Sequence, residues 1–221
     1  IDMANMIVTI DGPAGAGKST VARGLALRLG YQFLDTGAMY RAVTYAALRA
    51  GIDLSQTNGV ADFAEQLQID LKDENVFVDG SNVSLAIREV EVTSQVHFVA
   101  DNPKVREMLV RLQRRLAGGR DIVTEGRDQG TVVFPEARCK IFLTASAEQR
   151  AGRRLLELES HGQSATLDEV LSNQKQRDAR DRKRDVGPLA KATDAVEVCT
   201  DNMTLKEVID SLESLVRQHL P

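Results

Sequence analysis

The stretch GPAGAGKST, residues 12–20, follows the apolar run IVTI at 7–10 and precedes a helical pattern marked by Val21, Leu25 and Leu29. It matches G-x-x-x-x-G-K-[ST], the P-loop that binds the phosphates of ATP or GTP. Its glycines carry no Cβ atom, so the backbone can turn tightly and approach a polyphosphate closely. The helix that begins after the loop adds free N–H groups and the positive end of its dipole. A Gly-rich turn that binds nothing is the alternative, and the strand and helix on either side argue against it.

The P-loop assigns roles to particular side chains. Lys18 can reach the β- and γ-phosphates of a nucleotide, and Ser19 can offer its hydroxyl to Mg²⁺. The predicted ATP-binding residues are Gly12, Pro13, Ala14, Gly15, Ala16, Gly17, Lys18, Ser19 and Thr20. The loop by itself does not identify what receives the phosphoryl group.

Length and composition limit the class of protein. A chain of 221 residues is one large domain, or one domain with an insert. Its net charge of −4 argues against a general nucleic-acid binder. No apolar run approaches 18 residues, so we expect no membrane span. The segment at residues 1–5 is short and polar, so we expect no signal peptide. Cys139 and Cys199 lie far apart in apolar, strand-like runs, which predicts two buried thiols and a reducing cytoplasm.

The rest of the chain predicts an α/β fold with a parallel sheet and helices on both faces. Five helix-separated strands are expected at 7–10, 31–34, 121–124, 140–143 and 195–199. Three capping boxes, at 146–149, 166–169 and 204–207, predict helix starts. Between 62 and 90 the pattern changes to strand-like alternation with a D-G hairpin signal at 79–80. We therefore assign 1–61 and 91–221 to the core and 62–90 to an inserted, antiparallel subdomain.

Charged residues gather where open α/β sheets bind ligands, at the carboxyl ends of strands. The segment EGRD at 125–128 follows a buried strand directly. Glu125 is placed to orient a metal-bound water, and Arg127 and Asp128 are expected to face the crevice. A polar turn with a local ion pair is the alternative. Arg41, on the helix after the second strand, lies off the buried stripe and is either solvated or a ligand contact.

A second concentration of charge lies on a predicted helix near 177–185. One face of this helix comprises Arg177, Arg180, Asp181 and Arg184. Three guanidinium groups around one carboxylate suit a phosphate and a sugar hydroxyl better than pairing among themselves. A second face, with Asp178, Arg182 and Asp185, is expected to be solvated and salt-bridged. Ser94 and Arg106, on the two helices after the insert, carry little information alone.

Four segments resemble bacterial-type cytidylate kinases, which belong to the nucleoside monophosphate kinase group of P-loop kinases. These segments are IDGPAGAGKS at 10–19, LDTGAMYR at 34–41, EGRDQGTVVFP at 125–135 and the arginine-rich stretch at 177–184. The resemblance runs from about residue 7 to 216. Many families share the P-loop, whereas D-[ST]-G-A-x-Y-R and G-R-D-x-G-T-V-V-F-P are far more specific.

The resemblance implies an activity and a set of roles. A cytidylate kinase converts MgATP and CMP or dCMP to ADP and CDP or dCDP, in pyrimidine nucleotide metabolism. The implied contacts to the CMP phosphate are Arg41, Arg127 and Arg184. Those to the ribose are Arg177 and Asp181. Those to the cytosine are Ser94, Arg106 and Asp128, with Thr36 nearby. Lys18, Arg127 and Arg184 would be the catalytic residues. Arg150, Arg153 and Arg154 would belong to a lid at about 151–166, the insert would extend the monophosphate-binding region, and the enzyme would be a cytoplasmic monomer.

The chain departs from the family pattern at two places, and other interpretations stay open. Glu125 stands where many members have Asp, and Cys199, Thr200 and Asp201 replace the D-[ST]-[ST] after the last strand. Another small-molecule P-loop kinase, acting on shikimate, dephospho-coenzyme A or UMP and CMP equally, is one alternative. A GTP-dependent switch is a second, and the sequence has no N-K-x-D motif to support it. A nucleic-acid-binding ATPase is a third, and the acidic net charge disfavours it.

Overall fold

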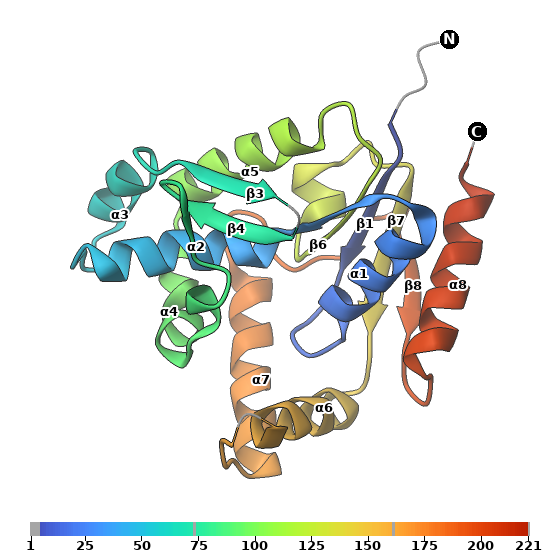
Figure 1. The fold of residues 1–221 in the computed structure, drawn as a ribbon. Coiled ribbons are helices and arrows are strands. Elements are labelled where there is room, and N and C mark those ends of the chain that lie inside the picture. Colours follow the sequence, from blue (N-terminus) through green and yellow to red (C-terminus); the bar gives the residue numbers. More distant parts are fainter. Residues whose placement is uncertain (1–4, 73, 161, 221) are drawn as a thin grey trace. The chain divides into compact units, whose positions relative to one another are not determined.

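A five-stranded parallel sheet organises the chain (Figure 1). The computed structural model describes residues 5–72, 74–160 and 162–220. The strands stand in the order β2-β6-β1-β7-β8, with bounds β1 Ile7–Asp11, β2 Gln32–Asp35, β6 Ile122–Gly126, β7 Cys139–Thr144 and β8 Val196–Cys199. All five were expected from the sequence, and the predicted α/β fold is confirmed. The central strand β1 has a neighbour on each side, and its Val8 and Ile10 are fully buried.

The chain divides into two compact units. The first unit joins Ile1–Phe33 to Gly119–Pro221, and the second is Leu34–Gly118. The boundaries predicted for the insert, 62–90, and for the lid, about 151–166, stay predictions; residue 161 of that lid lies outside the described residues. Among the described residues, no helix has the length and apolar character needed to cross a bilayer.

Helices α1 Lys18–Leu29 and α8 Leu205–Gln218 contribute to the core that covers the sheet of the first unit. Helices α6 Ala147–Ser160 and α7 Leu167–Lys183 pack against each other, and one turn of π-helix, η2, spans Gln129–Val133. The core between β1, β7, α1 and α8 includes Ile10, Leu25, Ile141, Leu143 and Leu212. Helix α1 ends at Gly30, whose φ of 71° is the left-handed value that favours glycine at this position.

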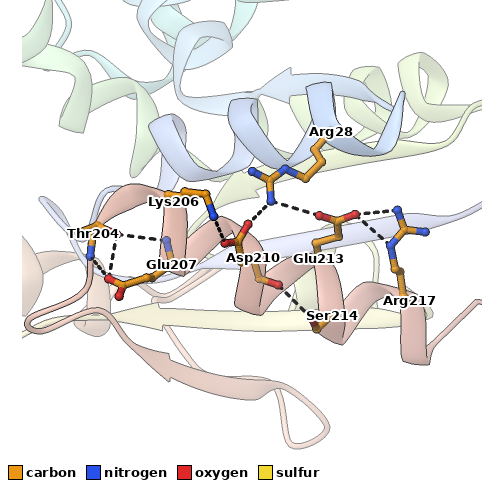
Figure 2. A network of polar contacts seen from close by, with 8 residues as sticks. All are labelled: Arg28, Thr204, Lys206, Glu207, Asp210, Glu213, Ser214 and Arg217. Atoms are coloured by element: carbon orange, nitrogen blue, oxygen red, sulfur yellow. Dashed lines mark hydrogen bonds and ion pairs between the residues drawn. The ribbon is translucent and has the colours of Figure 1, made fainter.

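Polar contacts join the outer surfaces of α1 and α8 (Figure 2). Arg28 on α1 pairs with Asp210 and, at 3.2 Å, with Glu213 on α8, and Glu213 also accepts from Arg217. These charges are largely exposed, so each pair contributes little, and the apolar contacts beneath them carry most of the packing energy. The capping box that opens α8 forms as predicted between Thr204 and Glu207.

The second unit contains its own small antiparallel sheet. Its elements are α2 Thr36–Arg49, α3 Thr57–Ala64, β3 Ile69–Lys72, β4 Asn75–Val78, β5 Ser81–Asn82, η1 Ala86–Arg88, α4 Val90–Ala100 and α5 Pro103–Ala117. The strands are ordered β3-β4-β5. Asp79 and Gly80 join β4 to β5 with φ values of 48° and 78°, as a two-residue hairpin turn requires. The predicted hairpin is therefore confirmed.

Two local predictions need correction. Cys139 is buried as expected, but Cys199 is exposed, because β8 is an edge strand with only β7 beside it. The capping box expected at the start of α6 is half formed. The Gln149 N–H donates to Ser146 Oγ at 3.3 Å, while the Ser146 N–H donates at 2.9 Å to Asp201, which the loop after β8 brings alongside. The box at Thr166 forms in full.

Candidate functional site

The P-loop links β1 to α1 in the backbone conformation that its glycines permit. Gly15 and Gly17 have φ values of 77° and 86°. A Cβ atom at Gly12 would lie 2.0 Å from the carbonyl oxygen of Leu143 on β7, far inside van der Waals contact. The loop is therefore held against the neighbouring strand, with the N-terminus of α1 beginning at Lys18. A glycine-rich loop directly before a helix N-terminus suits an anion, and phosphate binding here stays a prediction.

Lys18 is a buried cation. Its Nζ donates to the Pro13 carbonyl of the same loop at 2.8 Å, and only 5% of the residue is exposed. Burial lowers the pKa of Lys18 to about 7, with a further contribution from the positive charge of Arg127, while Glu125 acts in the opposite direction. An anion bound in the loop would stabilise the protonated amine. A bound anion would therefore act as the charge partner of the Lys18 amine.

Ser19 and Glu125, the two residues assigned to magnesium from the sequence, lie in contact. Ser19 Oγ donates to Glu125 Oε1 at 2.8 Å, and Glu125 is buried near the end of β6. A hydroxyl and a carboxylate are oxygen donors of the kind Mg²⁺ prefers, with phosphate oxygens and waters completing its shell. These two residues therefore fit a nucleotide-bound magnesium ion. Among the described residues, no group of three or more His, Cys, Asp or Glu side chains could hold a metal ion by itself.

Two arginines converge on one buried carboxylate in the same unit. Arg127 Nε donates to Asp181 Oδ2 at 2.8 Å, and Arg184 Nη2 donates to Asp181 Oδ1 at 2.8 Å. Burial opposes the charge on Asp181, but Arg127, Arg184 and Arg177 outweigh it and lower its pKa. Burial likewise opposes the charge on Arg127, but Asp181 outweighs it and raises the pKa of Arg127. A guanidinium carries five N–H donors in a planar fork, which matches the geometry of a phosphate.

The prediction for the faces of α7 was wrong for Asp178. The buried stripe of this helix is Val170, Gln174, Asp178 and Asp181. Asp178 accepts from the Ala14 N–H at 3.2 Å and pairs at 2.7 Å with Arg150, which also donates to the Ala14 carbonyl at 2.7 Å. Instead of belonging to a solvated face, Asp178 therefore ties α6 and α7 to the P-loop. The spacing of Asp178 from Gln174 and Asp181, four and three positions, was the available signal that they share a face of the helix. That spacing did not indicate which face of the helix is buried.

The other two arginines expected in the lid differ in their surroundings. Arg153 donates at 3.0 Å to both the hydroxyl and the carbonyl oxygen of Thr200, and at 3.5 Å to the Ala16 carbonyl of the P-loop. Arg154 pairs with Glu157 on the exposed side of α6 at 2.7 Å. Arg150 and Arg153 thus contact the P-loop backbone, whereas the pair formed by Arg154 lies in solvent.

Asp11, the last residue of β1, was not singled out from the sequence. Its two carboxylate oxygens accept the N–H groups of Gln129 and Gly130, each at 2.8 Å. Burial raises the pKa of Asp11 to about 6, although the two hydrogen bonds act against this rise. The available signal was an acidic residue that ends an otherwise uncharged strand directly before the P-loop.

Four of the predicted substrate contacts belong to the second unit: Thr36, Arg41, Ser94 and Arg106. Asp35 caps α2 and pairs with Arg41 at 3.3 Å and with Arg88 at 3.9 Å. Thr36, the first residue of α2, is buried. The Nε atom of Arg41 is buried and has no hydrogen-bond partner among the described residues, which is an unusual state for a guanidinium.

Arg106 and Ser94 lie on adjacent helices of this unit. Arg106 is buried on α5, donates to the Ala100 carbonyl at 3.0 Å and places its guanidinium 5.4 Å from the ring centre of Tyr40. Ser94 is exposed on α4 and donates to the Glu91 carbonyl at 3.0 Å. The convergence of these residues with Arg127 and Asp128 on one substrate stays a prediction.

Comparison with known proteins gives a consistent result over almost the whole chain. A family model described as cytidylate kinase matches residues 8–218. A cytidylate kinase of Rhodopirellula baltica is 51% identical over 213 residues, covering 96% of this chain and 93% of that protein. One of Clostridioides difficile is 42% identical, covering 97% of this chain and 99% of that protein. A shikimate kinase from Bacteroides thetaiotaomicron has a similar fold, with a TM-score of 0.51 at 14% identity, over 97% of this chain and 99% of that one.

Proposed function

The chain belongs to the cytidylate kinase family, and we propose that it transfers the γ-phosphoryl group of MgATP to CMP or dCMP, releasing ADP and CDP or dCDP. It is a nucleoside monophosphate kinase, a phosphotransferase. One observation carries the mechanism. Strands β1 and β6 pair in parallel with Asp11 opposite Gly126, so the P-loop and the segment 127–128 leave adjacent strands at the same edge of the sheet. Adjacent strands lie about 4.8 Å apart, which is the scale of a donor and an acceptor phosphate in contact.

The P-loop forms the donor half of the proposed site. Lys18 and the backbone N–H groups of the loop would hold the β- and γ-phosphates of ATP. Ser19 and, through water, Glu125 would hold Mg²⁺, which when bound neutralises charge on the phosphates. The low pKa of Lys18 supports this role, because a buried amine without a strong anionic partner has most to gain from a phosphate.

The arginines around Asp181 form the proposed acceptor half. Arg127 and Arg184, with Arg41, would bind the phosphate of CMP, while Arg177 and Asp181 would hold its ribose. Arginine suits a phosphate because its planar fork donates two parallel hydrogen bonds. Since the attacking oxygen already belongs to an anion, the reaction needs no general base, and positioning with charge neutralisation supplies the catalysis.

Selection of cytosine is proposed to rest on Asp128, Ser94 and Arg106, with Thr36 nearby. An aspartate and a serine can accept from the exocyclic amino group, while an arginine can donate to the ring nitrogen or carbonyl. Uracil presents a carbonyl and a ring N–H at the same positions, so polar groups of the site would be left unpaired. Such mismatches are costly in a buried site and reject the wrong base by a large factor.

The surroundings of the enzyme are also part of the proposal. We propose a cytoplasmic monomer that acts on small molecules, with no nucleic-acid or membrane partner. The net charge of −4 supports the absence of a nucleic-acid role.

A coupled assay of ADP release tests the proposal. Rates are measured with CMP, dCMP, UMP, AMP and shikimate as acceptors, with and without Mg²⁺. We expect turnover with CMP and dCMP, much lower kcat/KM with the other acceptors, and loss of activity when the metal is chelated. Turnover with UMP or AMP equal to that with CMP would contradict the assignment of cytosine specificity.

A further inference from the structure

We propose that Asp11 is a positioning residue that fixes the acceptor-binding segment 127–130 to the strand that carries the P-loop. The inference rests on the proposed roles of Arg127 and Asp128 in CMP binding. In this role Asp11 holds the donor and acceptor halves of the site in a fixed relative position, and it contacts neither substrate.

The geometry joins the two halves through a single side chain. The main chain of Asp11 continues directly into Gly12, the first residue of the P-loop. Its carboxylate accepts the N–H groups of Gln129 and Gly130 at 2.8 Å each, immediately after Arg127 and Asp128. The main chain therefore leads to the donor phosphates, while the side chain holds the acceptor segment.

Neighbouring contacts fix the same segment in one position. Gln129 is buried, and its side-chain oxygen accepts from Thr124 Oγ1 at 2.9 Å. A Cβ atom at Gly130 would lie 3.0 Å from Thr9 Oγ1 and 3.2 Å from Lys140 Cδ, so the backbone there is pressed against β1 and β7. The segment is thus held by its hydrogen bonds to Asp11 and by close packing against β1 and β7.

Two converging N–H donors require two acceptor oxygens. A carboxylate provides them, whereas the side chain of asparagine provides one oxygen and one N–H₂ group that would face a donor. The buried charge is unfavourable for folding, as the rise of its pKa to about 6 by burial indicates. The charges that act on it have opposite signs: Asp128 raises the pKa and Lys18 lowers it.

Loss of the hydrogen bonds from Asp11 to the segment 127–130 should impair binding of CMP more than binding of ATP. Arg127 and Asp128 directly precede the held residues, so their side chains would lose their fixed positions. Phosphoryl transfer is sensitive to displacements of about 1 Å between the reacting groups. The P-loop is independently held by Gly12 against Leu143 and by Asp178 at Ala14, so binding of ATP should persist.

The test compares Asp11→Asn and Gly130→Ala with the control Asp121→Asn. Asp121 accepts the Met6 N–H at 2.6 Å next to the opposite end of β1, so its replacement changes a similar hydrogen bond away from the site. In both test variants we expect the KM for CMP to rise about tenfold or more and kcat to fall. A change of this size is typical of the loss of one buried hydrogen bond. The KM for ATP should change less than about twofold, and Asp121→Asn should match wild type toward both substrates.

Two outcomes would overturn the inference. Wild-type kinetics toward CMP in Asp11→Asn would show that the attachment does not matter. Equal losses for ATP and CMP would assign Asp11 a purely structural role. Asp128→Ala, measured beside these variants, separates this inference from the proposed function. If Asp128→Ala binds CMP normally, the proposed role of Asp128 fails, whereas a defective Asp128→Ala beside a normal Asp11→Asn refutes the positioning role alone.

Discussion

Replacement of Lys18 by methionine is expected to make the protein more stable and catalytically inactive. The amine is buried, and its pKa falls from 10.5 to about 7. At about 1.4 kcal/mol for each pKa unit, that difference corresponds to about 5 kcal/mol of unfavourable charge burial below pH 7. Methionine removes the charge and keeps most of the volume. Loss of the hydrogen bond to Pro13 offsets about 1 kcal/mol, and imperfect repacking offsets a similar amount, which leaves a net gain of about 2–4 kcal/mol.

The effect should depend on pH in a defined direction. Above pH 7 the native lysine begins to lose its proton, whereas the unfolded chain keeps it until about pH 10.5. The unfolded state then binds more protons, so the wild-type protein gains stability as pH rises between these values. The advantage of Lys18→Met should therefore be largest below pH 7 and fade toward pH 10.

Thermal melting of both proteins from pH 6 to pH 9, without nucleotide, measures this difference. We expect Lys18→Met to melt several degrees higher at pH 6, with the gap narrowing as pH rises. Lys140→Met is the matched control: its buried amine already pairs with Asp194 at 2.7 Å, so its loss should lower the melting temperature. A Lys18→Met protein that melts lower than wild type at pH 6 would refute the reasoning about Lys18.

Three further substitutions test other parts of the site. Asp178→Ala leaves Arg150 as a buried cation without its carboxylate, so we expect denaturant unfolding to show about 3–5 kcal/mol of destabilisation. Adding Arg150→Met should restore part of this stability, and an unchanged unfolding midpoint in Asp178→Ala would contradict the tie between α6 and α7. Asp128→Ala should lose the preference for CMP over UMP while ATP affinity, followed by calorimetry, persists; a retained preference would remove Asp128 from base recognition. Arg184→Ala should raise the KM for CMP and lower kcat, since Asp181 then neutralises Arg127; steady-state kinetics equal to wild type would exclude Arg184 from the phosphate site.

Local patterns were enough to predict the fold. Each strand of the main sheet is a short apolar run with a helical pattern beside it, and the D-G pair at 79–80 has the positive φ values that its hairpin needs. The P-loop was recognisable because its motif lies within nine residues, although the constraint on Gly12 comes from Leu143 on β7. The hydrogen bond between Ser19 and Glu125 was not predicted, because it depends on the parallel pairing of β1 with β6.

Features that depend on distant neighbours were missed. The position of β8 at the edge of the sheet, which exposes Cys199, is set by strand order and not by the strand's own residues. The helical spacing on α7 assigned Asp178 and Asp181 to different faces, whereas both are buried, and Asp178 is inside because it contacts Arg150 and Ala14. Asp11 was overlooked because its partners are backbone N–H groups more than a hundred residues away, and these have no sequence signature.

Direct measurement of the phosphorylated product tests the central claim most sharply. The enzyme is incubated with Mg²⁺, γ-labelled ATP and equal concentrations of CMP and UMP, and the labelled nucleotides are separated and counted. The account predicts that label appears in CDP in step with ADP, with UDP a small fraction of it. Label released as inorganic phosphate without CDP, or UDP formed as fast as CDP, would contradict it.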